Sequence, residues 1–301
     1  MLRRRHPRHL RRRHPLPVPC DRRSPRGRRA RQRGLPAGRR HQGRRRCGRH
    51  PRTLARLPPS IRSVAREPSP VTGVRPRTIE LDHVSIDYEG RTALETTTLS
   101  LDEHRVAVIG SNGSGKSSFA RLLNGLTRPA RGEVRVHGLD PVRQSRLVRE
   151  RVGFVFANAD AQIVMPTVRE DVALSLRRLR LTASETAKRV DDALERTGLA
   201  GLADASTRSL SGGQKQLLAF ATVTVSEPAL IVADEPTASL DAVNARRIRE
   251  LIRALPQQVV VVTHDLRLAA ECDIALRFES GRLVARGPAA DVVARYDEEH
   301  R

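Results

Sequence analysis

The 301-residue sequence has few cysteines and no long apolar run. Its three cysteines, Cys20, Cys47 and Cys272, form no C-x-x-C pair and no cluster of metal ligands. This pattern excludes a disulfide-stabilised scaffold and is typical of a protein from a reducing compartment. Apolar runs such as Val259–Val262 are far shorter than the ~20 residues that a membrane-spanning helix requires. We therefore expect any membrane contact to be made through partner proteins.

Acidic residues are nearly absent from the first quarter of the chain. Residues 1–77 contain 26 arginines and only two acids, whereas the remainder carries 30 basic and 31 acidic side chains. The formal net charge of +23 therefore comes from this segment. Its self-repulsion and its lack of apolar periodicity predict a disordered Arg-rich extension. Two interpretations stay open: a tether to nucleic acid or anionic lipid, and a start of translation assigned too early, with the true start near Val71 or Val74.

From Thr78 onward, apolar runs alternate with amphipathic stretches. Residues 105–109, 230–233 and 259–262 read as buried parallel strands because they are short, apolar and β-branched. Residues 213–225 and 242–254 have helical periodicity, and a capping box is expected at Thr182 and Glu185. This alternation predicts an α/β fold with a largely parallel sheet.

A glycine-rich turn follows the first of these apolar strands. Residues 110–117 read Gly-Ser-Asn-Gly-Ser-Gly-Lys-Ser and fit G-x-x-x-x-G-K-[ST] between a strand and a helix. Such a turn points backbone N–H groups at phosphates, and the helix N-terminus adds positive potential. We expect Lys116 to contact the β- and γ-phosphates and the Ser117 hydroxyl to coordinate Mg²⁺. The candidate nucleotide-binding residues here are Gly110, Ser111, Asn112, Gly113, Ser114, Gly115, Lys116, Ser117 and Ser118.

A second apolar strand ends in two acids, Asp234 and Glu235. A buried strand can deliver Asp234 to a Mg²⁺ ion, and Glu235 can then polarise an attacking water. Together with the glycine-rich turn, this pair predicts a P-loop nucleoside triphosphatase that uses Mg²⁺.

Three further motifs resemble those of the ABC ATPase family. The family's signature L-S-G-G-Q is present as Leu210, Ser211, Gly212, Gly213 and Gln214. Residues 234–241 read D-E-P-T-A-S-L-D and residues 263–265 read T-H-D, in the family's order. The resemblance covers roughly residues 78–296. It implies a RecA-like core with an antiparallel β subdomain and a helical subdomain at about residues 158–212, within an ABC ATPase domain over residues 78–298.

The resemblance also implies roles for individual residues. Two such domains pair head to tail, so that each signature caps the γ-phosphate held by the other. Glu235 would be the general base, His264 would sense the γ-phosphate, and Asp241 would couple the two sites. Tyr88 occupies the position of the aromatic side chain that stacks on adenine.

One position departs from the family pattern. A glutamine usually follows the strand at residues 152–156, where it contacts Mg²⁺ and the membrane partner. Here that residue is Ala157, and Gln162 lies five residues further on. We expect Gln162 to contact the partner without taking over the Mg²⁺ role, and hydrolysis to be slower or coupled through a water. A non-hydrolysing partner subunit is an alternative, although the intact Glu235 and His264 argue against it.

Within the family, residues 156–171 resemble the energy-coupling-factor ATPases, which drive vitamin and metal-ion uptake. Residues 214–221 favour the biotin type over the cobalt or nickel type. The resemblance implies a homo- or heterodimer of ATPase domains with integral membrane transporter and substrate-binding subunits. It also implies a peripheral position on the cytoplasmic face of the cell membrane.

A rival interpretation is an ABC ATPase that acts on nucleic acid or the ribosome. Repair and chromosome members carry a long coiled coil between P-loop and signature, but only 93 residues separate Ser117 from Leu210 here. Translation factors of the family carry two ATPase domains, and this sequence has no internal repeat. The nearly neutral main domain also lacks a basic stripe, so no nucleic-acid partner is expected.

Overall fold

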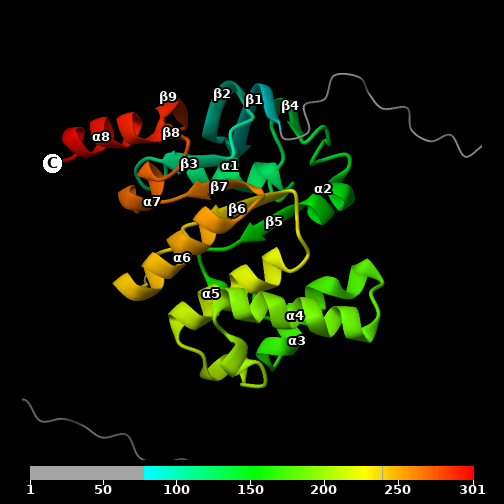
Figure 1. Cartoon of the computed structure of the whole chain (residues 1–301). Helices are drawn as coiled ribbons and strands as arrows, with labels where there is room; N and C mark the ends of the chain where they lie inside the picture. The colour runs from blue at the N-terminus through cyan, green and yellow to red at the C-terminus, as the bar shows by residue number, and fades with distance from the viewer. Residues whose placement is uncertain (1–77, 239) are drawn as a thin grey trace, which may run out of the picture. The chain divides into compact units, whose positions relative to one another are not determined.

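The computed structural model describes residues 78–238 and 240–301. The predicted Arg-rich extension lies outside the described residues. Figure 1 shows a mixed sheet with helices around it, a small second sheet, and a group of helices set apart from both. In the part of the chain that the structure describes, no helix is long and apolar enough to cross a membrane.

The central sheet has six strands in the order β5-β6-β7-β3-β8-β9. The first five are parallel and β9 is antiparallel to β8, which confirms the predicted largely parallel sheet. The strands are β3 (Arg105–Ile109), β5 (Val152–Val155), β6 (Leu230–Asp234), β7 (Gln258–Val262), β8 (Ile274–Glu279) and β9 (Arg282–Pro288). Both β6 and β7 are buried along their whole length, as their continuous apolar sequences require.

Alternate residues of these strands point into separate cores. Val106 and Val108 face α1 (Lys116–Leu123) and the small sheet, whereas Ala107 and Ile109 face α8 (Ala289–Glu299). On β6 and β7, the alternate residues face a core shared with α6 (Ala242–Ala254) and α7 (Leu266–Ala270). The nucleotide-binding turn after β3 is thus anchored by packing on both faces of the sheet.

The small antiparallel sheet has the order β2-β1-β4. It consists of β1 (Ile79–Tyr88), β2 (Arg91–Leu101) and β4 (Arg131–Val136). The hairpin between β1 and β2 turns at Glu89 and Gly90, both with positive φ, which suits a tight two-residue turn. Pairing with β1 extends β2 to Arg91, through the polar residues Arg91 and Thr92.

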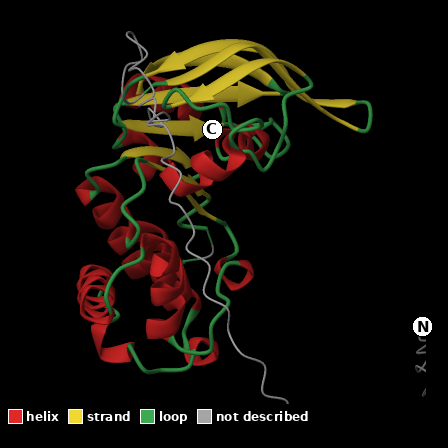
Figure 2. Cartoon of the chain, turned by 90° about the vertical axis from the view of Figure 1, so that its right-hand side faces the viewer, coloured by secondary structure: helices red, strands yellow, loops and turns green. Residues whose placement is uncertain are grey.

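The helical subdomain contains α3 (Val168–Leu176), α4 (Ala183–Thr197) and α5 (Gly212–Thr224), with short 3₁₀ turns at residues 159–161, 177–179, 200–202 and 207–209. Figure 2 shows these helices gathered away from the strands. The predicted capping box at Thr182 and Glu185 is confirmed, with both reciprocal hydrogen bonds present. Two short helices, α2 (Ser145–Arg151) and α7, have no predicted counterpart because neither presents a clear apolar stripe.

Candidate functional site

The glycine-rich turn after β3 is held open by two close backbone approaches. Gly110 has φ 142°, and a Cβ atom there would lie 2.0 Å from the carbonyl oxygen of Phe278. Gly115 has φ 100°, and its Cβ would lie 2.4 Å from the carbonyl oxygen of Ala93. Only glycine fits these two positions, so the turn keeps its inward-facing N–H groups.

Lys116 is the first residue of α1 and is buried. Its Nζ donates to the carbonyl oxygens of Gly110 and Ser111, both at 2.8 Å. Burial lowers the pKa of Lys116, while the nearby Glu235 and Asp234 oppose that shift. The ammonium group is therefore fixed inside the turn, where phosphate oxygens would meet it.

The second half of the site comes from the end of β6. The Ser117 hydroxyl donates to Asp234 Oδ1 at 3.1 Å, which joins the two predicted Mg²⁺ ligands directly. Burial raises the pKa of Asp234. Within residues 78–238 and 240–301, no group of three His, Cys, Asp or Glu side chains is placed to hold a metal ion alone. One hydroxyl and one carboxylate fit a Mg²⁺ ion that takes its other ligands from phosphates and water.

Glu235 and His264 lie against each other at the mouth of the turn. Glu235 Oε2 accepts a hydrogen bond from the His264 backbone N–H at 3.2 Å, and Oε1 lies 3.3 Å from His264 Nε2. Nε2 also lies 3.0 Å from Oδ1 of Asn112 in the glycine-rich turn. Desolvation raises the pKa of Glu235, partly offset by His264 and Lys116. A carboxyl whose pKa is raised is a stronger proton acceptor, which suits Glu235 to take a proton from water.

These residues line one cavity of about 410 Å³. Tyr88 lies at its rim, half exposed, with its hydroxyl 2.9 Å from the Thr127 hydroxyl, so its ring face is available for stacking. The walls also include Arg91 and Thr92, which sequence reasoning missed. The sequence signal that could have identified Arg91 is its position as a basic residue directly after the hairpin turn that follows Tyr88. The cavity thus brings together the glycine-rich turn, Tyr88, Glu235 and His264.

The predicted signature residues lie elsewhere, at the start of α5. Ser211 caps this helix: its hydroxyl oxygen accepts from the Gln214 N–H, and the Gln214 side chain accepts from the Ser211 N–H at 2.9 Å. This leaves the Ser211 hydroxyl proton and the exposed Gly212 as donors to an outside anion. Among the described residues, the lining of the nucleotide cavity includes no signature residue. The second anion site predicted at this helix end therefore lies outside the chain's own nucleotide cavity.

The segment after β5 is bound tightly to α5. The Gln162 side chain accepts from the Phe156 N–H at 3.2 Å and donates to the Ala219 carbonyl at 3.3 Å. Lys215, directly after the signature, pairs with Asp160 at 2.7 Å. Gln162 thus has both ends of its amide bonded within the chain, and its contact with a membrane partner stays a prediction.

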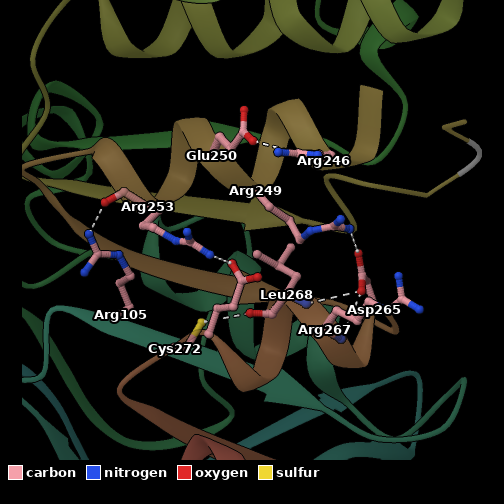
Figure 3. A network of polar contacts seen from close by, with 10 residues as sticks. Arg105, Arg246, Arg249, Glu250, Arg253, Asp265, Arg267, Leu268 and Cys272 are labelled. Carbon is pink, nitrogen blue, oxygen red and sulfur yellow. Dashed lines mark hydrogen bonds and ion pairs between the residues drawn. The ribbon is translucent and has the colours of Figure 1, made fainter. Parts of the chain in front are cut away.

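Helix α6 connects Asp241, the predicted coupling residue, with the loop that carries His264, the predicted γ-phosphate sensor. Asp241 caps α6 by accepting from the Asn244 N–H at 2.8 Å, and the hydrogen bonds from Asn244 hold its pKa below the usual range. Further along α6, Arg249 pairs with Asp265, the residue after His264, at 3.0 Å. Figure 3 shows Arg249 and Arg253 both directed from α6 toward α7. Sequence reasoning missed this connection because it joins segments 16 residues apart.

The glycine-rich cradle, the buried lysine and the acidic strand end define an ATPase of the P-loop class. The sequence profile of the ABC transporter family matches residues 94–238. A putative ABC transporter ATP-binding protein of Deinococcus radiodurans is 49% identical over 73% of this chain and 97% of its own length. The chain therefore belongs to the ABC transporter family as an ATP-binding subunit, and it hydrolyses ATP.

Other relatives place it near the energy-coupling-factor type. The biotin transport ATP-binding protein BioM of Rhizobium etli is 41% identical over 73% of this chain and 98% of its own length. The energy-coupling factor transporter ATP-binding protein EcfA1 of Bacillus subtilis is 38% identical, over 67% of this chain and 74% of its own.

Solved structures share the fold. For cbiO1 from Clostridium perfringens, part of the ABC transporter complex cbiONQ, the TM-score is 0.68 at 30% identity, covering 74% of this chain and 93% of that one. For the dimeric cassette MJ0796 bound to ADP and Pi, the TM-score is 0.65 at 29% identity, covering 70% of this chain and 98% of that one.

Proposed function

We propose that this chain drives uptake of biotin as the ATPase subunit of an energy-coupling-factor importer. The proposal that the substrate is biotin rests on the likeness to BioM over nearly the whole length of that protein. The residues 156–171 that favoured this type form a well-defined segment beside α5, with its turns fixed by side-chain hydrogen bonds.

In the proposed reaction, Lys116 and the backbone of the glycine-rich turn bind the ATP phosphates, and Tyr88 stacks on the base. A bound Mg²⁺, held by Ser117 and Asp234, would neutralise charge on the β- and γ-phosphates. Glu235 takes a proton from the attacking water, whose oxygen bonds to the γ-phosphorus while the bond to ADP breaks. His264 lies next to Glu235 and fixes its carboxylate through two contacts.

The signature acts on a second copy of an ATPase domain. Its donors at the α5 N-terminus lie outside the chain's own nucleotide cavity, so they serve a γ-phosphate bound by the partner. A head-to-tail dimer, of two identical or two related chains, satisfies both sites at once. ATP then holds the dimer together and hydrolysis releases it.

A groove of about 550 Å³ beside the signature helix is suited to a membrane partner. Val164 and Met165 lie on its wall, and Val164 is 71% exposed. Asp171 Oδ1 accepts from both of their backbone N–H groups, so this apolar edge is rigid. We infer that an integral membrane subunit docks here and that the chain lies on the cytoplasmic face of the membrane.

The test is uptake of labelled biotin by cells that express this chain with its neighbouring membrane proteins. Glu235→Gln is the control, because it keeps the shape of the side chain and removes the base. We expect ATP-dependent uptake that the variant abolishes. Full uptake in the variant would refute the role of Glu235.

The second candidate is a cobalt- or nickel-type importer, the alternative that the sequence of residues 214–221 disfavours; the chain also shares its fold with cbiO1 of the transporter complex cbiONQ. It predicts no biotin uptake, with ATPase activity still stimulated by the membrane partners. Uptake of labelled cobalt or nickel ions in the same cells, again lost in Glu235→Gln, would then identify the substrate.

A further inference from the structure

The position of His264 depends on a very short loop. Strand β7 ends at Val262 and α7 begins at Leu266, so only three residues set where the imidazole lies. The His264 side chain is 45% exposed and makes its polar contacts at its ring edge, with Glu235 and Asn112. Because little packing confines the ring, its position depends on how firmly the backbone of residues 263–265 is held.

Asp265 provides that fixation. Its Oδ1 accepts from the backbone N–H groups of Arg267 and Leu268 and so caps α7. Its own N–H donates to the Thr263 hydroxyl at 2.9 Å. The second oxygen, Oδ2, accepts from Arg249 Nη1 at 3.0 Å, which ties the loop to the middle of α6.

The Arg249–Asp265 pair differs from the other ion pairs of α6 in its burial. Its two side chains are only 17% and 20% exposed, compared with 64% and 35% for Arg253–Glu271. Arg246–Glu250, on the outer face of the helix, is still more exposed. An ion pair shielded from water holds its geometry more firmly than one that solvent screens.

We propose that Arg249 is a positioning residue for ATP hydrolysis, which holds His264 against Glu235 by fixing Asp265. This inference rests on the roles proposed for Glu235 and His264. Because Asp241 caps the same helix, α6 also ties the place of Asp241 to that of His264. A shift of α6 therefore moves Asp241 and His264 together.

The test compares two arginines that join α6 to α7. In Arg249→Ala we expect kcat to fall about 10- to 100-fold with little change in the KM for ATP, since a displacement near 1 Å has such an effect. In Arg253→Ala, whose side chain pairs with Glu271 beyond the far end of α7, we expect kcat within about twofold of the parent chain because that ion pair is exposed. Equal losses in the two variants, or an effect on KM alone, would show that Arg249 only joins the helices.

Asp265→Asn keeps a good helix cap and removes the charge. We expect it to lower kcat like Arg249→Ala, and the double variant to be no worse than either single one. Arg249→Lys should recover part of the loss, because it keeps the charge but not the planar fork. If Arg249→Ala does not fold, these two variants decide the question, and unchanged kcat in Asp265→Asn refutes the proposal.

His264→Ala separates this inference from the proposed site. If His264→Ala hydrolyses ATP at the parent rate, the role of His264 is wrong and the inference falls with it. If His264→Ala is inactive while Arg249→Ala is normal, only the inference is wrong.

Discussion

The two signature glycines should respond in opposite ways to the same substitution. A Cβ atom at Gly212 would meet nothing within 4 Å, whereas one at Gly213 would lie 2.4 Å from the side chain of Asn244. Replacing glycine by alanine in a helix gains at most ~1 kcal/mol of folding free energy. We therefore expect Gly212→Ala to leave stability unchanged or slightly raised.

At Gly213 this gain in folding free energy is outweighed by a steric clash with Asn244. The new methyl group must displace Asn244, and overpacking of this kind costs about 1–3 kcal/mol. It also disturbs the Asn244 Nδ2–Asp241 Oδ2 hydrogen bond of 2.7 Å, which is worth ~1 kcal/mol. The net loss of about 1–3 kcal/mol corresponds to a fall in Tm of roughly 2–12 °C for a domain of this size.

The assay is thermal unfolding followed by far-UV circular dichroism, because the sequence contains no tryptophan to report by fluorescence. ATP is left out so that contacts between copies do not contribute. Adding Asn244→Ala to Gly213→Ala should cost less than the sum of the single changes, since the added methyl group then has space. The reasoning would be refuted if Gly213→Ala were as stable as Gly212→Ala.

Two further predictions concern Lys116 and Cys272. Lys116→Ala should weaken ATP binding about 10- to 100-fold in equilibrium titrations, because a charge-assisted hydrogen bond is worth about 1.5–3 kcal/mol; unchanged affinity would contradict the phosphate-binding role. Burial raises the pKa of the Cys272 thiol to about 12, so the reactive thiolate is scarce at pH 8 and becomes commoner only as the pH rises toward that value. Iodoacetamide should therefore leave Cys272 unmodified in the folded chain at pH 8 and alkylate it in guanidinium, as read by peptide mass spectrometry; equal labelling in both would contradict its burial.

The parts of the fold that the sequence predicted depend on patterns among residues that are close together in the chain. The apolar strand at residues 230–233 and the capping box at Thr182 and Glu185 depend on neighbours within a few positions, and the structure has them where expected. The positions of Glu235 and His264 followed from ordered motifs, and the structure brings their side chains together.

Contacts between distant segments could not be predicted in this way. Nothing near Arg249 in the sequence indicates that it meets Asp265, since the pairing depends on how α6 packs over β7. Arg91 differs, because it lies directly after the hairpin turn that follows Tyr88 and reaches the nucleotide cavity through the pairing of β2 with β1. The absence of glutamine at Ala157 was visible in the sequence, but the use of Gln162 to bind Phe156 and Ala219 required the structure.

The nucleotide-binding turn has a consequence for synthesis on the ribosome. Ser114 accepts a hydrogen bond from the Gly281 N–H at 3.0 Å, and the carbonyl of Gly281 accepts from the Glu95 N–H at 2.8 Å. The cradle at residues 110–117 is therefore completed by a turn made almost 170 residues later in the chain. A nascent chain that has passed all the other motifs still lacks this support. The cradle thus gains its full set of backbone hydrogen bonds only after residue 281 has been made and has folded against residues 95 and 114.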